Sequence, residues 1–338
     1  MLSIGVDEDS PGQWEALSGL NIKSLSLSES MSQSLSSLTR LERLSIIEND
    51  DSHVLWEVLR VSSLTRLERL SIIEDDESHV LWEVLRVSSL TRLERLSIIE
   101  DDESHVLWEV LRGLNIKSLN LSGRWSLDLT MHHVESLSQS LSSLTQLETL
   151  SIQVNKESPG LWKALSGLSI KTLNLRYALR SLRVKHVESI SQSLSSLIRM
   201  ETLSIEVYDD SHVLWEALRG LNIKSLKQSG WCSGGLIVNH VVSLSQSLSS
   251  LTQLEKLSIC VSEEMPGLWG ALRSLNINKL SLSGCLRVNN VELLSNSLSS
   301  LTQLKTLSII VEKDSPGLWE ALRCLNIKNL GVEWFASE

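Results

Sequence analysis

Leucine and isoleucine recur along the chain at spacings that predict a series of short strands. Two kinds of segment, A (L-x-x-L-x-I) and B (I-x-x-L-x-L), end in alternating apolar and polar residues, as in a strand with one buried face. The A segments are Leu41–Ile46, Leu67–Ile72, Leu93–Ile98, Leu147–Ile152, Met200–Ile205, Leu254–Ile259 and Leu304–Ile309, with Leu2–Ile4 as the tail of another. The B segments are Ile22–Leu27, Ile116–Leu121, Ile170–Leu175, Ile277–Leu282 and Ile327–Val332, and one more that begins at Ile223 is interrupted by Lys227 and Gln228.

A short helix is expected after each A segment. A serine stands at the N-cap position in most copies, and all 4 prolines of the chain occupy the next position, where a missing N–H costs nothing. Eight of the 11 tryptophans share one position in these helices, where a large ring can fill the wedge between helix and sheet. We therefore predict a structural core role for Trp14, Trp56, Trp82, Trp108, Trp162, Trp215, Trp269 and Trp319.

The first third of the chain repeats itself almost without change. Arg66–Arg86 recurs unchanged at Arg92–Arg112, and Arg40–Arg60 differs from both only at Asn49 and Asp51. These copies follow one another without a B segment, which we interpret as loss of B units during duplication. A fixed period of a few tens of residues marks a solenoid, in which each unit buries its apolar face against its neighbours.

The strand core, the step from strand to helix and the alternation of two unit types resemble leucine-rich repeats of the ribonuclease-inhibitor-like class. The resemblance implies an α/β fold, a curved leucine-rich-repeat horseshoe with a parallel β-sheet on the concave face and helices on the convex face. Strands about 4.8 Å apart and helices about 8–10 Å apart account for such a curve. We expect residues 1–338 to form a single array of about 14 strand units, uncapped at both ends and part of a longer protein.

Composition and motifs narrow the possible functions. The net charge of −10 argues against nucleic acid as the main partner. The four cysteines form no CxxC pair, which indicates reduced thiols and a cytoplasmic location. No apolar run reaches transmembrane length, so no membrane partner is expected. We find no catalytic or phosphate-binding motif and predict neither enzyme activity nor a cofactor. His53, His79 and His105 recur one per repeat, too far apart to share a metal ion, so no metal site is expected.

Polar residues that flank the buried strand positions should line the exposed face of the sheet. We expect Arg43, Arg69 and Arg95 to stack there as a ladder, whose mutual repulsion is relieved either by an acidic partner or by the nearby carboxylates of Glu42, Glu68 and Glu94. Ile47 has two possible placements, on the exposed face or turned inward in place of the valine that other A segments carry one residue later. The candidate partner-binding residues are Arg43, Arg69, Arg95, Ser45, Ser71, Ser97, Arg176 and Lys279.

The resemblance extends to a class of receptor. Arrays of this kind are similar to the sensor regions of animal nucleotide-binding, leucine-rich-repeat (NLR) innate immune receptors, which implies a non-catalytic recognition module that binds a protein ligand on its concave face. The effector domain would then lie outside this chain. Two alternatives stay open, the substrate-receptor repeats of a ubiquitin ligase and an inhibitor or regulator of a GTPase or nuclease.

Overall fold

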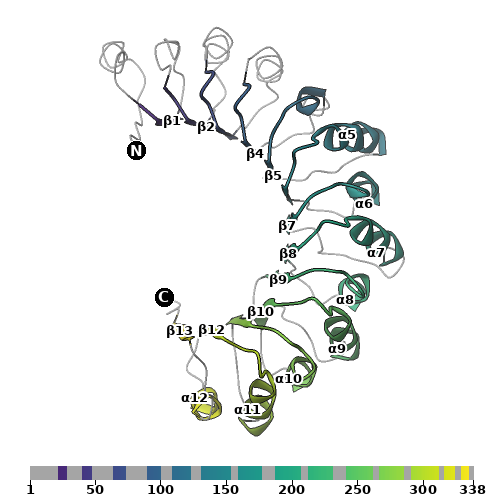
Figure 1. Ribbon diagram of the computed structural model, residues 1–338, viewed down its shortest axis with the longest axis vertical. Helices are drawn as coiled ribbons and strands as arrows, with labels where there is room; N and C mark the ends of the chain where they lie inside the picture. Colours follow the sequence, from purple (N-terminus) through teal and green to yellow (C-terminus); the bar gives the residue numbers. More distant parts are fainter. Residues whose placement is uncertain are drawn as a thin grey trace. The chain divides into compact units, whose positions relative to one another are not determined.

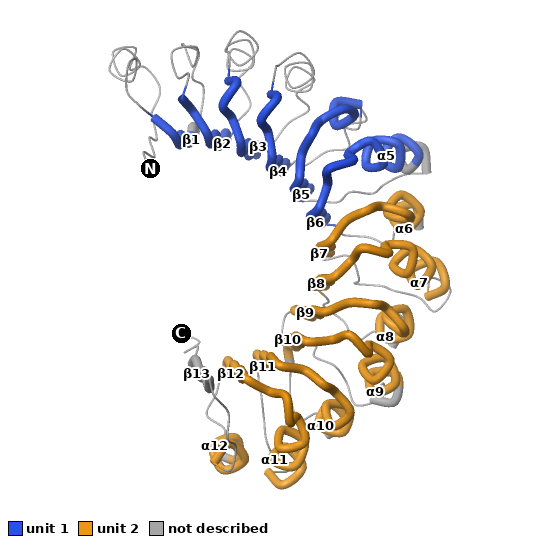
Figure 2. The backbone as a smooth tube through the Cα atoms, viewed as in Figure 1, with its two compact units in different colours: residues 1–154 blue, residues 155–338 orange. Residues whose placement is uncertain are grey.

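The computed structural model describes most of the chain as two compact units, residues 1–154 and residues 155–338 (Figure 2). The described residues are 22–28, 40–47, 64–73, 90–99, 109–122, 131–153, 159–176, 187–206, 212–230, 241–261, 266–284, 291–311, 316–323 and 329–334. Each unit consists of a parallel sheet with helices on one side of it (Figure 1).

The first unit contains a run of parallel strands in chain order. Each strand pairs with the next in sequence, and the leucines of neighbouring strands are in register, as in Leu44, Leu70 and Leu96. Helix α5 (Met131–Ser143) lies between the last two strands in sequence. The strands are β1 (Ser24–Ser28), β2 (Arg43–Ile47), β3 (Arg69–Ile73), β4 (Arg95–Ile99), β5 (Ser118–Ser122) and β6 (Thr149–Gln153).

The second unit repeats the arrangement with a helix after nearly every strand. Its strands also pair in parallel and in chain order. The strands are β7 (Thr172–Arg176), β8 (Thr202–Glu206), β9 (Ser225–Ser229), β10 (Lys256–Val261), β11 (Lys279–Gly284), β12 (Thr306–Val311) and β13 (Asn329–Trp334). The helices are α6 (Pro159–Leu165), α7 (Val187–Ser196), α8 (His212–Ala217), α9 (Val241–Ser250), α10 (Pro266–Leu272), α11 (Val291–Ser300) and α12 (Pro316–Leu322).

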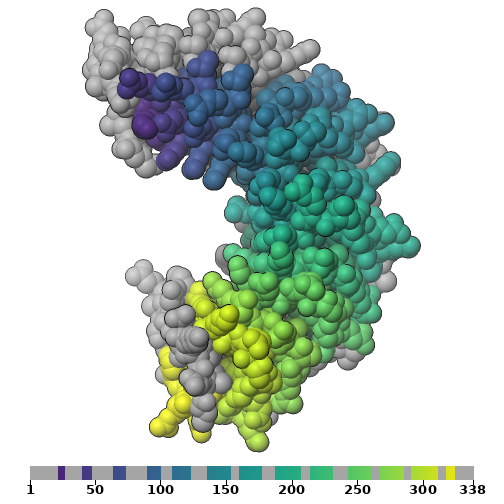
Figure 3. All heavy atoms as spheres, viewed as in Figure 1, coloured from purple at the N-terminus to yellow at the C-terminus, as the bar shows by residue number. Residues whose placement is uncertain are grey.

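Alternation along each strand separates the core from the exposed face. In β7, Leu173 and Leu175 are buried, while Arg176 is exposed. Leucines of the helices, such as Leu194 and Leu248, are buried as well, and Figure 3 shows the atoms of the second unit closely packed on the face that it presents. Parallel strands from successive repeats, backed by helices on one face, define a leucine-rich-repeat solenoid, as the sequence predicts.

The tryptophan position is buried in the second unit with one exception. Trp162, Trp215 and Trp269 are 5%, 1% and 2% exposed. Trp319 is 37% exposed, so the core role expected for it is wrong. The reason is its place in α12, because α6, α8 and α10 are each followed by another helix that packs on them, whereas no described helix follows α12. Trp14, Trp56, Trp82 and Trp108 lie outside the described residues.

Serines of α7 and α9 bond to the end of the tryptophan-bearing helix that precedes each of them. Ser196 Oγ accepts a hydrogen bond from the Gly167 N–H at 2.8 Å, and Ser250 Oγ accepts one from the Gly220 N–H at 2.9 Å. Both glycines follow the end of a tryptophan-bearing helix and have a positive φ (+78° and +74°), the backbone conformation that commonly ends a helix. Ser247 is fully buried and donates to the Trp215 carbonyl. The serines are therefore part of the helix packing.

Strand β9 corrects the interruption expected at Lys227 and Gln228. The strand continues through both residues, and Gln228 occupies the inward position that leucine or isoleucine holds elsewhere. Gln228 is 8% exposed, and its Oε1 accepts a hydrogen bond from the Cys260 N–H at 3.2 Å. The Cys260 thiol donates to the Gly230 carbonyl at 3.3 Å. Because its amide oxygen finds a backbone partner, the buried glutamine is tolerated in the core.

Candidate functional site

Three arginines form a row across the first unit. Arg43 pairs in register with Arg69, and Arg69 with Arg95, at the first residue of β2, β3 and β4. All three side chains are exposed, while the next residue of each strand, a leucine, is buried. The three arginines thus lie in the predicted ladder, and neighbouring arginines are one strand spacing apart, about 4.8 Å.

Two further rows lie beside the arginines on the same face. Ser45, Ser71 and Ser97 are half-buried and in register, two residues along each strand. The third row is Ile47, Ile73 and Ile99. Ile47 is 39% exposed, so the inward placement that the sequence left open is wrong. The alternation simply continues to the end of the strand, which places residue 47 on the face that carries Arg43. We call these nine residues the Arg-Ser-Ile face.

Small polar residues border this face on both sides. Ser24 of β1 and Ser118 of β5 stand in register with the arginine row. Asn120 of β5 extends the serine row, and its Nδ2 donates to Ser97 Oγ at 2.8 Å. The arginine row is therefore confined to the three duplicated strands.

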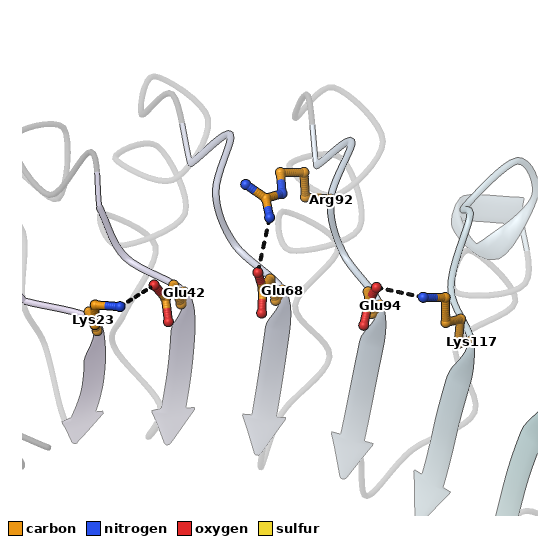
Figure 4. Close-up of polar contacts among 6 residues, drawn as sticks. All are labelled: Lys23, Glu42, Glu68, Arg92, Glu94 and Lys117. Carbon is orange, nitrogen blue, oxygen red and sulfur yellow. Dashed lines mark hydrogen bonds and ion pairs between the residues drawn. The ribbon is translucent and has the colours of Figure 1, made fainter.

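The neighbouring glutamates have other partners. Lys23 Nζ lies 2.8 Å from Glu42 Oε1, and Lys117 Nζ lies 2.6 Å from Glu94 Oε1 (Figure 4). Glu68 in the middle is reached at 3.2 Å by Arg92, from the turn before β4. The glutamates therefore form their direct ion pairs with these side chains and not with the strand arginines, although the charges of Arg43 and Arg95 contribute, after the lysine hydrogen bonds, to lowering the pKa of Glu42 and of Glu94. In the described part of the chain, no ion pair or hydrogen bond involves the guanidinium groups of the strand arginines.

The two lysine pairs favour the ionised glutamates. The hydrogen bond from Lys23 lowers the pKa of Glu42, with smaller contributions from the charges of Arg43 and Arg66. The hydrogen bond from Lys117 lowers the pKa of Glu94, and the same contact raises the pKa of Lys117. Ionised Glu42 and Glu94 are therefore favoured at the N-terminal ends of β2 and β4, next to the arginine row.

The alternation of A and B segments explains this arrangement. The residue before the strand is usually glutamate in A segments and lysine in B segments, so the two charges alternate along the turns. In the second unit this gives the pair Lys224–Glu201 at 3.0 Å. Where B segments are missing, Glu42, Glu68 and Glu94 become neighbours, and the backbone N–H of each later glutamate donates to the carbonyl of the one before. Arg92 supplies the charge that a B lysine would otherwise provide to Glu68.

The remaining candidates do not join one site. Arg176 stands at the C-terminal end of β7, and Lys279 stands at the N-terminal end of β11. Four strand spacings separate them, about 19 Å. Lys279 is instead in register with Lys256, which the sequence analysis missed although it holds the same strand position as Arg43. Arg92 was also missed, and the Glu–Lys alternation before the strands was the signal that could have revealed its role.

The described residues contain no group of three or more His, Cys, Asp or Glu side chains placed to hold a metal ion. His53, His79 and His105 lie outside the part that the structure describes. Within the described residues, no helix is long and apolar enough to cross a membrane.

Solved leucine-rich-repeat structures are among the proteins that resemble this chain. No protein-family model and no curated protein matches the chain. The crystal structure of the TLR13–ssRNA13 complex aligns with a TM-score of 0.48 at 15% identity, over 99% of this chain and 55% of the TLR13 chain, so this chain spans about half of that protein's length. A leucine-rich-repeat protein of Leptospira interrogans aligns with a TM-score of 0.45 at 13% identity, over 99% of this chain and 84% of the other. Because both TM-scores are below 0.5, the fold assignment rests on the parallel strand ladder itself.

Proposed function

We propose that this chain is a non-catalytic recognition module that binds a protein partner on the Arg-Ser-Ile face. The observation that carries the proposal is the in-register row of Arg43, Arg69 and Arg95, exposed and without an ion pair or hydrogen bond among the described residues. A surface of this composition is suited to a partner that presents carboxylates.

The energetics favour an anionic ligand. Two like charges about 4–5 Å apart in water repel by about 1 kcal/mol, and the middle arginine has a neighbour on each side. A carboxylate placed between two guanidinium groups relieves this repulsion and forms charge-assisted hydrogen bonds. The guanidinium group also holds its charge at any physiological pH.

The isoleucine row favours a protein over a nucleic acid. Ile47, Ile73 and Ile99 offer apolar area that a phosphate backbone does not use, and the whole chain carries a net charge of −10. Nucleic-acid binding also depends on neutralising several phosphates at once, which favours a surrounding field of positive charge. Here the arginine row is bordered by three glutamates.

More specifically, we propose that this recognition module is the sensor region of a cytoplasmic innate immune receptor of the NLR type. This assignment is supported by the near-identical tandem copies, because a recognition family that gains and loses repeats changes its binding surface one strand at a time. The alternatives, a ubiquitin-ligase substrate receptor and a regulator of a GTPase or nuclease, would use the same face and differ in the protein bound.

Peptide display tests the proposal and does not require the natural partner. A random peptide library is selected against the purified chain, and the selected peptides are titrated against wild type, against R43E/R69E/R95E and against K227E/K256E/K305E. The last variant makes the same change in net charge at exposed positions of the second unit. We expect acidic peptides whose affinity falls about tenfold or more, at least 1.4 kcal/mol, only with the arginine variant.

Two results would count against this function. Equal weakening by both triple variants would indicate binding to net charge alone. Tight, arginine-dependent binding of single-stranded RNA by a chain that selects no peptide would replace the protein partner with a nucleic acid.

A further inference from the structure

The Arg-Ser-Ile face has dimensions that restrict the shape of its ligand. Three strands place the ends of each row about 10 Å apart, and four residues along a strand place the arginine row about 13 Å from the isoleucine row. The face thus has two chemically different edges, one cationic and one apolar, with the small polar serine row between them.

We propose that this face receives a short amphipathic α-helix of the protein partner, lying across the strands with an acidic flank on the arginines and an apolar flank on the isoleucines. This inference rests on the proposed function and specifies its ligand. A helix is about 10–12 Å wide including its side chains, which matches the distance between the two outer rows. Its axis would lie over Ser45, Ser71 and Ser97, which leave room for it.

The spacing along the arginine row also fits a helix. Side chains at i and i+4 on a helix stand about 5–6 Å apart, close to the strand spacing of about 4.8 Å. Carboxylates at positions i, i+4 and i+7 of one helix face span about 10.5 Å along the axis, close to the length of about 10 Å of the arginine row, and can therefore meet three arginines in turn. In an extended peptide, side chains on one face recur about every 6.6 Å. Three of them span about 13 Å, which is longer than the arginine row of about 10 Å, so the third side chain misses its arginine.

Backbone hydrogen bonding also favours a helical ligand over an extended one. The N–H and C=O groups of β2, β3 and β4 are used within the ladder, so the face offers a ligand side chains only. An extended peptide lying on it would leave its own backbone groups without protein partners, whereas a helix satisfies them internally.

The surrounding charges set the position of the helix. Glu42, Glu68 and Glu94 stand at the N-terminal ends of the strands, each in an ion pair with a lysine or with Arg92, so an acidic ligand that moves beyond the arginines meets ion pairs and no free cation among them (Figure 4). Ser24 and Ser118 end the arginine row on each side. The acidic flank is thereby limited to about two turns of helix.

Synthetic peptides test this geometry. The first is a lactam-stapled helix of about 14 residues with glutamates and leucines segregated on two flanks, since unstapled helices of that length are marginal in water. The second has the same composition with the two residue types mixed around the helix. The third carries the segregated sequence without the staple and with a central proline. Each is titrated by fluorescence anisotropy against wild type, R43S/R69S/R95S and I47S/I73S/I99S, whose serines copy the residues of β1 and β5 in the same register.

We expect the stapled, segregated helix to bind wild type about tenfold tighter than either other peptide, and both serine variants to lose most of that difference. Circular dichroism confirms that the variants are folded. Equal binding of the proline peptide would overturn the helix, as would binding that does not depend on Ile47, Ile73 and Ile99. If display still yields arginine-dependent peptides in that case, the proposed function stands and only the helical ligand is lost.

Discussion

The first residue of each strand differs more between repeats than any core residue does. It is arginine in β2, β3 and β4, serine or threonine in several other strands, and lysine in β10 and β11. This side chain points away from the core, so its identity has little effect on packing and is available for binding. The three duplicated copies all carry arginine at this position, so their exposed arginines form a row.

The tryptophan position shows the opposite behaviour, and it yields a prediction at the scale of one residue. Truncation of Trp215 to alanine should lower the free energy of unfolding by about 3–5 kcal/mol, because its ring is 1% exposed and its removal leaves a cavity. Trp319→Ala is the matched variant in the same sequence context, and we expect less than half that loss. Urea unfolding followed by circular dichroism measures both. Equal losses would show that the difference in burial has no energetic consequence.

At the scale of elements, the serine-rich helices have a defined role. Their buried serines allow close approach to the preceding helix, and a later serine accepts the N–H of the glycine that ends it. This pattern gives the α6–α7 and α8–α9 pairs a polar contact in addition to leucine packing.

The hydrogen bond from the Gly220 N–H to Ser250 allows a direct test of this contact. Ser250→Ala should destabilise the second unit by about 1 kcal/mol, the usual net value of such a bond. Ser249→Ala is the control, because the exposed Ser249 hydroxyl bonds only to Gln246 of its own helix. The two variants are compared by urea unfolding, and a loss of stability in Ser249→Ala as large as that in Ser250→Ala would contradict the role of this contact.

The positions of the elements follow from the sequence, whereas several of their contacts do not. Leucine spacing located every described strand, since burial of one face is a local, periodic property. The pairing of Glu68 with Arg92 depends on which repeats become neighbours, and the inward Gln228 depends on a single backbone N–H at Cys260. The exposure of Trp319 likewise reflects whether another helix covers it. These three features depend on tertiary contacts between repeats, which hydrophobic periodicity along the sequence does not predict.

At the scale of the whole molecule, repeats are units of surface as well as of structure. Each added A copy contributes one arginine, one serine and one isoleucine to the exposed face, in register with the copy before. Because no B segment stands between these copies, the serines and lysines of B segments do not separate these rows. Each further copy therefore enlarges the Arg-Ser-Ile face and leaves the pattern of buried core residues unchanged.

Pyrene excimer fluorescence tests this stacking most directly. Pyrene is attached to paired cysteines in a background in which the four native cysteines are replaced by serine. We predict strong excimer emission for R43C/R69C and for R69C/R95C, whose labels stand one strand spacing apart, about 4.8 Å, on the same face. The control R43C/S142C, with one label on the sheet and one on helix α5, should show monomer emission. Excimer emission from the adjacent pairs no stronger than from this control would contradict the in-register arginine row.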